Sequence, residues 1–120
     1  MKYLMLLYNN PAAFQTLTPE GMQGVMEFFD DLQKETVESG ERVDTAGLAD
    51  ASHVRTVRSQ DGTAVATDGP FAETKEVLAS YAIYDVDGHD RAMELAARVA
   101  EATTGTVEIW PLMDFGGTEM

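Results

Sequence analysis

The stretch KYLMLLY, residues 2–8, decides the fold, because it is apolar at nearly every position over the length of one strand. Successive side chains of a strand point to opposite faces of a sheet, so such a run is typical of a strand covered on both sides. It is far shorter than the roughly 20 apolar residues of a membrane span, and it lacks the small-residue cleavage site of a secretory signal. We therefore expect a buried strand over residues 2–8.

An amphipathic helix is expected next, from about residue 19 to residue 39. Thr18 suits the N-cap, Pro19 suits the first helical position, and Gly40 suits a left-handed C-cap. The apolar residues of this helix recur at helical spacing and are expected to face the core: Met22, Val25, Met26, Phe29, Leu32 and Val37.

The rest of the chain adds strands and one more helix. Alternating β-branched residues on both sides of Asp61 and Gly62 predict a β-hairpin over residues 53–68. A second helix is expected over residues 89–103, with an inner stripe of Ala92, Leu95, Ala96 and Val99. Further strands are expected at residues 42–48, 77–86 and 106–112.

This order of elements amounts to two strand-helix-strand units around a β-insertion. Two right-handed crossovers in one sheet predict a single ferredoxin-like α+β domain over residues 1–120, with both helices on one face. The other sheet face would also be apolar, because alternate residues of the first strand point to opposite sides: Tyr3, Met5 and Leu7 against Leu4, Leu6 and Tyr8. An apolar face left in water usually marks an interface. We therefore expect a homodimer in which two sheets pack face to face.

Charge and composition exclude several classes of function. Twenty-one acidic against eight basic residues give a net charge of −13, which repels nucleic acid and anionic membranes. The absence of cysteine rules out disulfides and thiolate metal sites and suits a reducing cytoplasm. Zinc and iron sites need clustered ligands, and the two histidines are far apart in sequence. We expect a cytoplasmic protein without a metal or cofactor.

The segment DGPFAETKE, residues 68–76, joins the expected hairpin to the next strand. It opens with the turn-forming residues Asp68, Gly69 and Pro70. Phe71 has no apolar neighbour except alanine and is expected to plug into the core or into a partner chain. Glu73 and Lys75 point to one side if the segment is extended, which brings a carboxylate and an ammonium near a sheet end.

From this loop we take Asp68, Lys75 and His53 as candidate catalytic residues, and Phe71, Glu73 and Tyr81 as candidate substrate-binding residues. His53 titrates near neutral pH and could serve as a general base beside Asp68, although a lone histidine is more often a surface or hairpin residue. Lys75, among acids that favour its charged form, suits an anionic or carbonyl ligand. The alternative is a structural turn held by an ion pair.

Several motifs point to a known family, namely MKYLMLLY at the start, LTPE, VRTVRSQDG, TDGPFAETKEVLASYAIYDVDG and the closing GTVEIWPL. Over nearly the whole chain the sequence closely resembles the DGPF family within the YCII-related proteins. The resemblance implies a dimeric α+β barrel in a small bacterial cytoplasmic protein, often encoded beside extracytoplasmic-function sigma factors. It also implies a histidine-aspartate pair like that proposed for some relatives by likeness to muconolactone-isomerase-like barrels, but His53 and His89 both lie outside the motif.

The sequence is compatible with two functions. The first is binding of a small anionic or carbonyl compound in a cleft of the dimer barrel near the DGPFAETKE loop, with or without acid-base catalysis. The second is a non-catalytic dimer that acts as an accessory to a sigma-factor regulatory system.

Overall fold

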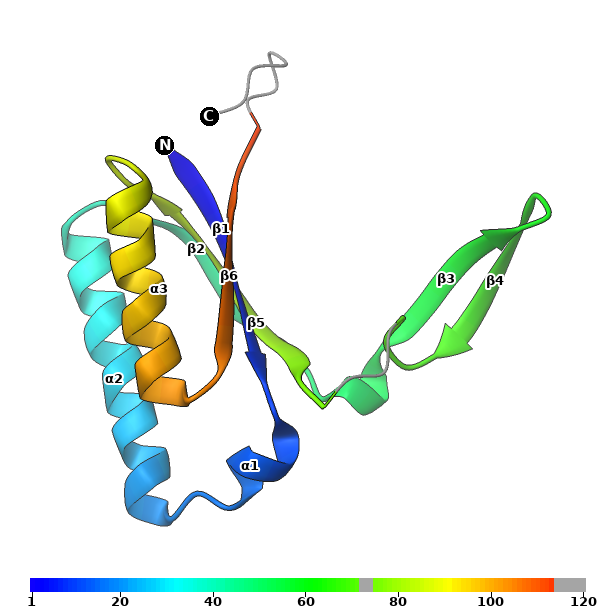
Figure 1. Cartoon of the computed structure of the whole chain (residues 1–120), viewed down its shortest axis with the longest axis horizontal. Coiled ribbons are helices and arrows are strands. Elements are labelled where there is room, and N and C mark those ends of the chain that lie inside the picture. Colours follow the sequence, from blue (N-terminus) through cyan, green and yellow to red (C-terminus); the bar gives the residue numbers. More distant parts are fainter. Residues whose placement is uncertain (72–74, 114–120) are drawn as a thin grey trace.

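The computed structural model describes residues 1–71 and 75–113 of the chain (Figure 1). Its elements, in chain order, are β1 (Lys2–Asn9), α1 (Pro11–Gln15), α2 (Pro19–Glu38), β2 (Arg42–Gly47), a 3-10 turn (Ala51–His53), β3 (Arg55–Gln60), β4 (Thr63–Asp68), β5 (Val77–Asp85), α3 (His89–Thr103) and β6 (Thr106–Pro111). Four strands form an antiparallel sheet in the order β2-β5-β1-β6, and β3 and β4 form a separate two-stranded sheet. This is the ferredoxin-like order, so the predicted α+β class is confirmed.

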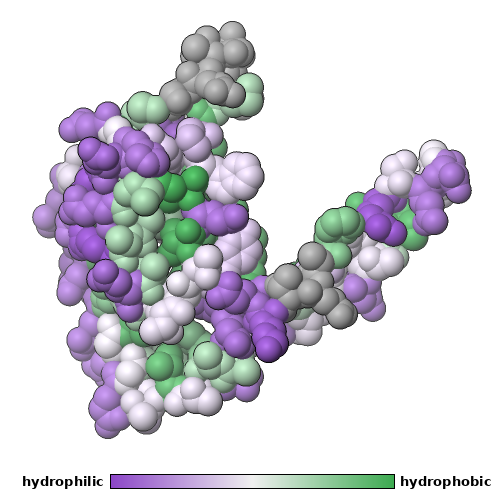
Figure 2. Space-filling view, viewed as in Figure 1, coloured by the Kyte–Doolittle hydropathy of each residue, from purple (hydrophilic) through white to green (hydrophobic). Residues whose placement is uncertain are grey.

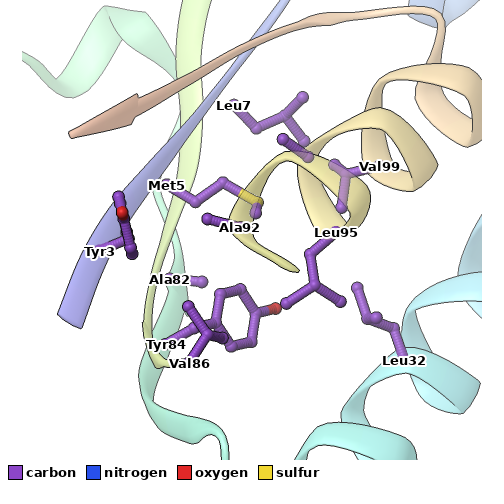
Figure 3. Close-up of a cluster of buried hydrophobic side chains, with 11 residues drawn as sticks. Tyr3, Met5, Leu7, Leu32, Ala82, Tyr84, Val86, Ala92, Leu95 and Val99 are labelled. Carbon is purple, nitrogen blue, oxygen red and sulfur yellow. The ribbon is translucent and has the colours of Figure 1, made fainter. Parts of the chain in front are cut away.

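Helices α2 and α3 cover one face of the four-stranded sheet (Figure 1). The set of β1 side chains that meets them is Tyr3, Met5 and Leu7, and all three are buried. Leu95 of α3 lies at the centre of this core and is 0% exposed. The predicted inner stripe of α3 is confirmed, because all four of its residues are buried in the core that Figure 3 shows.

The predicted limits of α2 are confirmed to within one residue. The backbone amide of Gly21 donates a 3.0 Å hydrogen bond to Oγ1 of the N-cap Thr18, and Gly40 has φ +79° just beyond the helix end. Met26 and Val37 were expected in the core, and this prediction is wrong for both, because their side chains are 65% and 52% exposed. Thr36 is buried in place of Val37, with its hydroxyl donating to the Leu32 carbonyl at 2.8 Å. The hydroxyl is thereby satisfied within the helix, which removes the usual cost of burying it.

In the described part of the chain no helix covers the second face of the sheet, which we call the open face (Figure 1). Leu4 of β1 lies opposite Ile83 of β5 and Trp110 of β6, so these three side chains share this face. Leu6 lies on the same side, and Trp110 is 54% exposed. The chain alone therefore leaves an apolar sheet face in solvent, as the alternation along residues 2–8 predicts.

Strands β3 and β4 form a hairpin that stands apart from the rest of the domain, as Figures 1 and 2 show. We call residues 55–68 the arm and the rest of the described chain the body. The predicted turn is confirmed: Asp61 and Gly62 have φ of +52° and +80°, as a tight hairpin turn requires. The 3-10 turn with His53 comes before the arm rather than within it.

A short helix, α1, follows β1 and was not predicted. Asn10 caps it, accepting a 3.0 Å hydrogen bond from the amide of Ala12, and Pro11 occupies the first turn. Among the residues that the structure describes, no helix is long and apolar enough to cross a membrane.

Candidate functional site

A cavity of about 580 Å³ lies between α2 and the helix-covered face of the sheet. Its volume falls within the range of sites for small molecules, roughly 300–1,000 Å³. Most of its wall is apolar and comes from both layers, with Met5 and Leu7 on β1, Phe14 on α1, and Met22 and Phe29 on α2. The predicted apolar stripe of α2 therefore lines a cavity along part of its length, instead of packing directly on the sheet.

Small side chains on two neighbouring strands explain why this space is open. On the helix-covered face, Thr45 of β2 pairs with Ala82 of β5, and Gly47 pairs with Ser80. Large residues at these positions would reach up to α2 and fill the gap, but these four cannot. The cavity thus follows from which strand residues meet across the β2-β5 register.

Two hydroxyl groups in the cavity wall are available to a ligand. Thr45 and Thr103 use their hydroxyls on backbone carbonyls, at 2.9 Å to Tyr81 and 2.7 Å to Val99. Ser80 and Tyr84, by contrast, make no side-chain hydrogen bond within the described part of the chain. They lie on one face of β5, about 13 Å apart along the strand.

The electrostatic character of the cavity follows from its lining residues. None of them is a lysine, arginine or histidine, and Asp30 is the one charged residue among them. Burial raises the pKa of the Tyr84 phenol, so this group stays protonated at neutral pH and can donate a hydrogen bond. The lining suits a neutral, mainly apolar compound better than an anion.

The predicted site loop begins at the root of the arm, on the far side of the molecule from the helices (Figure 1). The Asp68 carboxylate pairs with Arg55, with Oδ1 3.2 Å from Nε, and both side chains are largely exposed. Gly69 has φ +88° and its amide donates to the Val54 carbonyl at 2.8 Å, which closes the end of the hairpin. The ion-pair partner of Asp68 is therefore Arg55, at the root of the arm, which was not among the residues considered for the loop.

The other predicted loop residues are spread over the surface. Phe71 is 75% exposed, with the Arg58 guanidinium 5.8 Å from its ring centre. The expectation that it plugs into the core of its own chain is therefore wrong, while its insertion into a partner remains a prediction. Lys75 is exposed, and Glu73 lies outside the described residues.

The two histidines lie in different parts of the molecule. His53 is exposed at the end of the 3-10 turn. Hydrogen bonds from Ser52 are the main cause that lowers the pKa of nearby Asp50, and the charge of His53 adds to this effect. His89 begins α3 on the helix-covered side, with its ring 6.4 Å from that of Tyr3. The structure does not bring the two histidines into one site.

Tyr81 lies on β5 and is among the residues that line the cavity, unlike the loop residues with which it was grouped. Its hydroxyl donates a 2.9 Å hydrogen bond to Asp44, and this bond raises the pKa of the phenol. Tyr8 makes an equivalent 2.9 Å bond to Glu108, with the same effect on its pKa. In each pair the tyrosine hydroxyl donates its hydrogen bond to an acid on the neighbouring strand.

One charged cluster escaped the sequence analysis because it joins distant positions. Arg91 of α3 contacts Glu35 and Glu41 at 3.1 and 2.8 Å, and Arg98 contacts Glu35 at 2.8 Å. Hydrogen bonds from Arg98 and then Arg91 lower the pKa of Glu35 to about 2. The cluster ties α2 to α3, a structural role, and only the spacing of Arg91 and Arg98 on one side of α3 hinted at it.

Comparison with known proteins places the chain in a family. The family model described as "YCII-related domain" matches residues 1–116 of the chain. A protein of Rhizobium meliloti (strain 1021), named "Uncharacterized protein R00369", is 32% identical over 114 residues, which cover 93% of this chain and 92% of that protein. The matched residues 1–116 include the arm and all the cavity residues named above. The chain therefore belongs to the family of YCII-related proteins.

Proposed function

We propose that this YCII-related protein binds a small, neutral and mainly apolar molecule, with a carbonyl or similar acceptor group, in the cavity beneath α2. The cavity of about 580 Å³ is the observation that carries the proposal. Natural cores are close-packed, and a space of this size between two layers is far larger than ordinary packing defects. An apolar wall with a few hydrogen-bonding groups is the usual form of a ligand site.

The hydroxyls of Ser80 and Tyr84 favour a carbonyl compound over a carboxylate. Either of them can donate to a carbonyl oxygen, whereas a buried carboxylate needs a cation or several donors to offset its desolvation. Among the described residues, no basic side chain lines the cavity. Of the two ligand classes expected from the sequence, the carbonyl class therefore fits better.

Acid-base catalysis would require a titratable group at the bound molecule. Asp68, Lys75 and His53 do not line the cavity, whereas Asp30 and Tyr84 do. We therefore assign binding to the cavity, and not to the DGPFAETKE loop.

The proposal includes a homodimer with two sheets packed through their open faces, as in the α+β barrel that the resemblance implies. Leu4, Leu6, Ile83 and Trp110 support it, because together they form an apolar surface that one chain leaves uncovered. The cavity lies on the other side of the sheet, so binding and dimerisation use opposite faces.

A thermal-shift screen with small ketones, lactones and carboxylates tests the cavity. Ser80→Leu fills the space, and Tyr84→Phe removes only a hydroxyl. We expect a lactone or ketone to stabilise the wild type, to lose its effect on Ser80→Leu, and to bind about tenfold more weakly to Tyr84→Phe, as expected for one lost hydrogen bond. Tyr8→Phe, which removes a hydroxyl from the open face, is the control and should bind normally.

The competing functions give different results in the same screen. Ligands that stabilise Ser80→Leu as strongly as the wild type would contradict the cavity site. If carboxylates alone bind, and Lys75→Met abolishes their effect, the site lies at the loop instead. A wild type that no compound in the screen stabilises favours the accessory protein of a sigma-factor system.

A further inference from the structure

Within the described residues the arm has no hydrophobic core of its own, and the body covers little of it: the Arg58 guanidinium lies 5.8 Å from the ring centre of Phe71. All residues of β3 and β4 are exposed except Thr56, which is half-buried, and Val57 is 64% exposed. The side-chain hydrogen bonds and ion pairs of the arm reach no further than its root, where Arg55 pairs with Asp68 and Thr56 donates to Gly69. A two-stranded hairpin is marginally stable at best in water. The arm therefore needs a partner surface to keep its strands regularly paired.

The whole chain is too open for a monomer of its size. It exposes 8303 Å² at 13.1 kDa, against about 6,400 Å² expected for a compact monomer. Its radius of gyration is 16.5 Å, against about 13.6 Å expected. The surplus area of about 1,900 Å² exceeds the roughly 800 Å² that each partner buries in a standard interface. The arm and the open face both contribute to this surplus.

The arm points in a direction that leaves a space between it and the open face. Figure 1 shows the arm leaving the body near the start of β5 and pointing away from the helices, so that arm and sheet form the two sides of a V. A strand of six residues is about 20 Å long, whereas packed sheets lie about 10 Å apart. A second sheet on the open face would thus sit between sheet and arm, and the arm would extend past it.

The chemistry of the arm suits a second copy of this chain. Val57 lies opposite Ala66, and Ala64 lies opposite Ser59 on the same side, so this face of the hairpin is mainly apolar beyond the Arg55–Asp68 pair at its root. The face that carries Arg58 is mainly polar. Arg55 and Arg58 balance Asp61 and Asp68, so the arm has no net charge, while the rest of the chain has all of the −13. A neutral, partly apolar arm can approach a strongly acidic partner without the repulsion that two bodies experience.

We propose that the arm is a clasp, in which the second copy packs between the open face and the arm, and the face with Val57, Ala64 and Ala66 rests on the partner. This inference rests on the homodimer in the proposed function. Each chain would hold the other with its own arm, as two-fold symmetry requires. The interface would then consist of two patches, the sheet and the arm.

A matched pair of arm variants tests the clasp. Ala66→Glu and Thr67→Glu place the same charge on neighbouring residues of β4, on opposite faces of the hairpin. The dimer dissociation constant is measured by sedimentation over a dilution series of the full chain. We expect Ala66→Glu to raise it at least tenfold, because a carboxylate would be buried without a partner, and Thr67→Glu to change it less than threefold.

Hydrogen exchange of the arm amides gives a second measurement that does not depend on a substitution. Residues 55–68 should exchange at least tenfold more slowly in the dimer than in the diluted monomer. A wild type that stays monomeric refutes the homodimer and the clasp together. A wild-type dimer that Ala66→Glu does not weaken, or whose arm is unprotected, refutes the clasp alone and leaves the arm to another occupant. If both variants weaken the dimer equally, the assignment of the apolar face is wrong.

Discussion

The body and the arm obey the same local rules, but they differ in what covers them. Both have regular antiparallel pairing, and both end their elements at glycines with positive φ, Gly40 in the body and Gly62 in the arm. In the body the alternate residues of each strand meet helices, and Leu95 is fully buried between layers. In the arm the same alternation leads to solvent on both sides. Local sequence therefore determines that a hairpin forms, whereas its stability depends on a surface beyond it.

The largest contrast between the two regions should appear on truncating an apolar side chain. Leu95→Ala removes a fully buried side chain of the body and should lower the free energy of unfolding by about 3 kcal/mol, within the 2–5 kcal/mol range for such cavities. Val57→Ala is the counterpart in the arm and should change it by less than about 0.5 kcal/mol in the monomer. Urea unfolding at a concentration below the dimer dissociation constant measures both. Equal losses would show that the arm is part of the core.

A second contrast concerns the glycines of the body. A Cβ at Gly105 would lie 2.6 Å from the Tyr8 carbonyl oxygen and 2.6 Å from Asn9 Oδ1, whereas a Cβ at Gly47 would meet no atom within 4 Å. Gly105→Ala should therefore cost roughly 2 kcal/mol, since the start of β6 must move away from β1. Gly47→Ala should be nearly neutral. The thermal midpoint of each variant measures this difference. An unchanged midpoint for Gly105→Ala would mean that the β1-β6 pairing shifts at little cost in stability.

The arm has its own glycine test, with a smaller expected effect. Gly62 has φ +80°, a conformation that alanine disfavours by about 1 kcal/mol. Gly62→Ala should speed hydrogen exchange of the arm amides about fivefold and leave the thermal midpoint of the monomeric body unchanged. A drop in that midpoint would show that arm and body unfold as one unit.

The smallest effect is expected from the ion pairs that join the two helices. The pKa of Glu35 is lowered to about 2 by Arg98 and Arg91. The ionised Glu35 carboxylate stabilises the fold above its unfolded pKa of about 4.5, and this contribution is lost as the pH falls toward 2. Since the partners are partly exposed, it amounts to no more than about 1 kcal/mol.

Glu35→Gln should therefore lower stability slightly at pH 7 and flatten its decline between pH 4.5 and pH 2. Glu38→Gln controls for the change in net charge. Identical pH profiles of unfolding for these two variants would contradict the assignment.

The fold could be predicted from sequence because its signals are local. Apolar periodicity located the helices and strands, Thr18 and Gly40 marked the limits of α2, and Asp61 with Gly62 marked the turn of the arm. The error at Val37 has a physical cause that periodicity ignores: the Thr36 hydroxyl bonds within the helix, and a polar residue can then be buried.

The candidate site was harder to predict, because it depends on contacts between distant segments. The cavity arises where Thr45 meets Ala82 and Gly47 meets Ser80, and this register is set only when β2 and β5 pair. The runs of small residues at 45–47 and 79–80 were visible in sequence, but not that they face one another under α2. The loop motif, by contrast, drew attention to Asp68, which the structure pairs with Arg55.

The position of the single tryptophan gives the open face an intrinsic optical reporter. Trp110 is 54% exposed on that face, and no other indole contributes to the emission of the chain. In the separated chain the ring is partly hydrated and should emit at long wavelength. If a second sheet covers it, the emission maximum should move to the blue in step with chain concentration. The same titration on Ala66→Glu would distinguish coverage of the open face from engagement of the arm, since Trp110 senses the sheet alone.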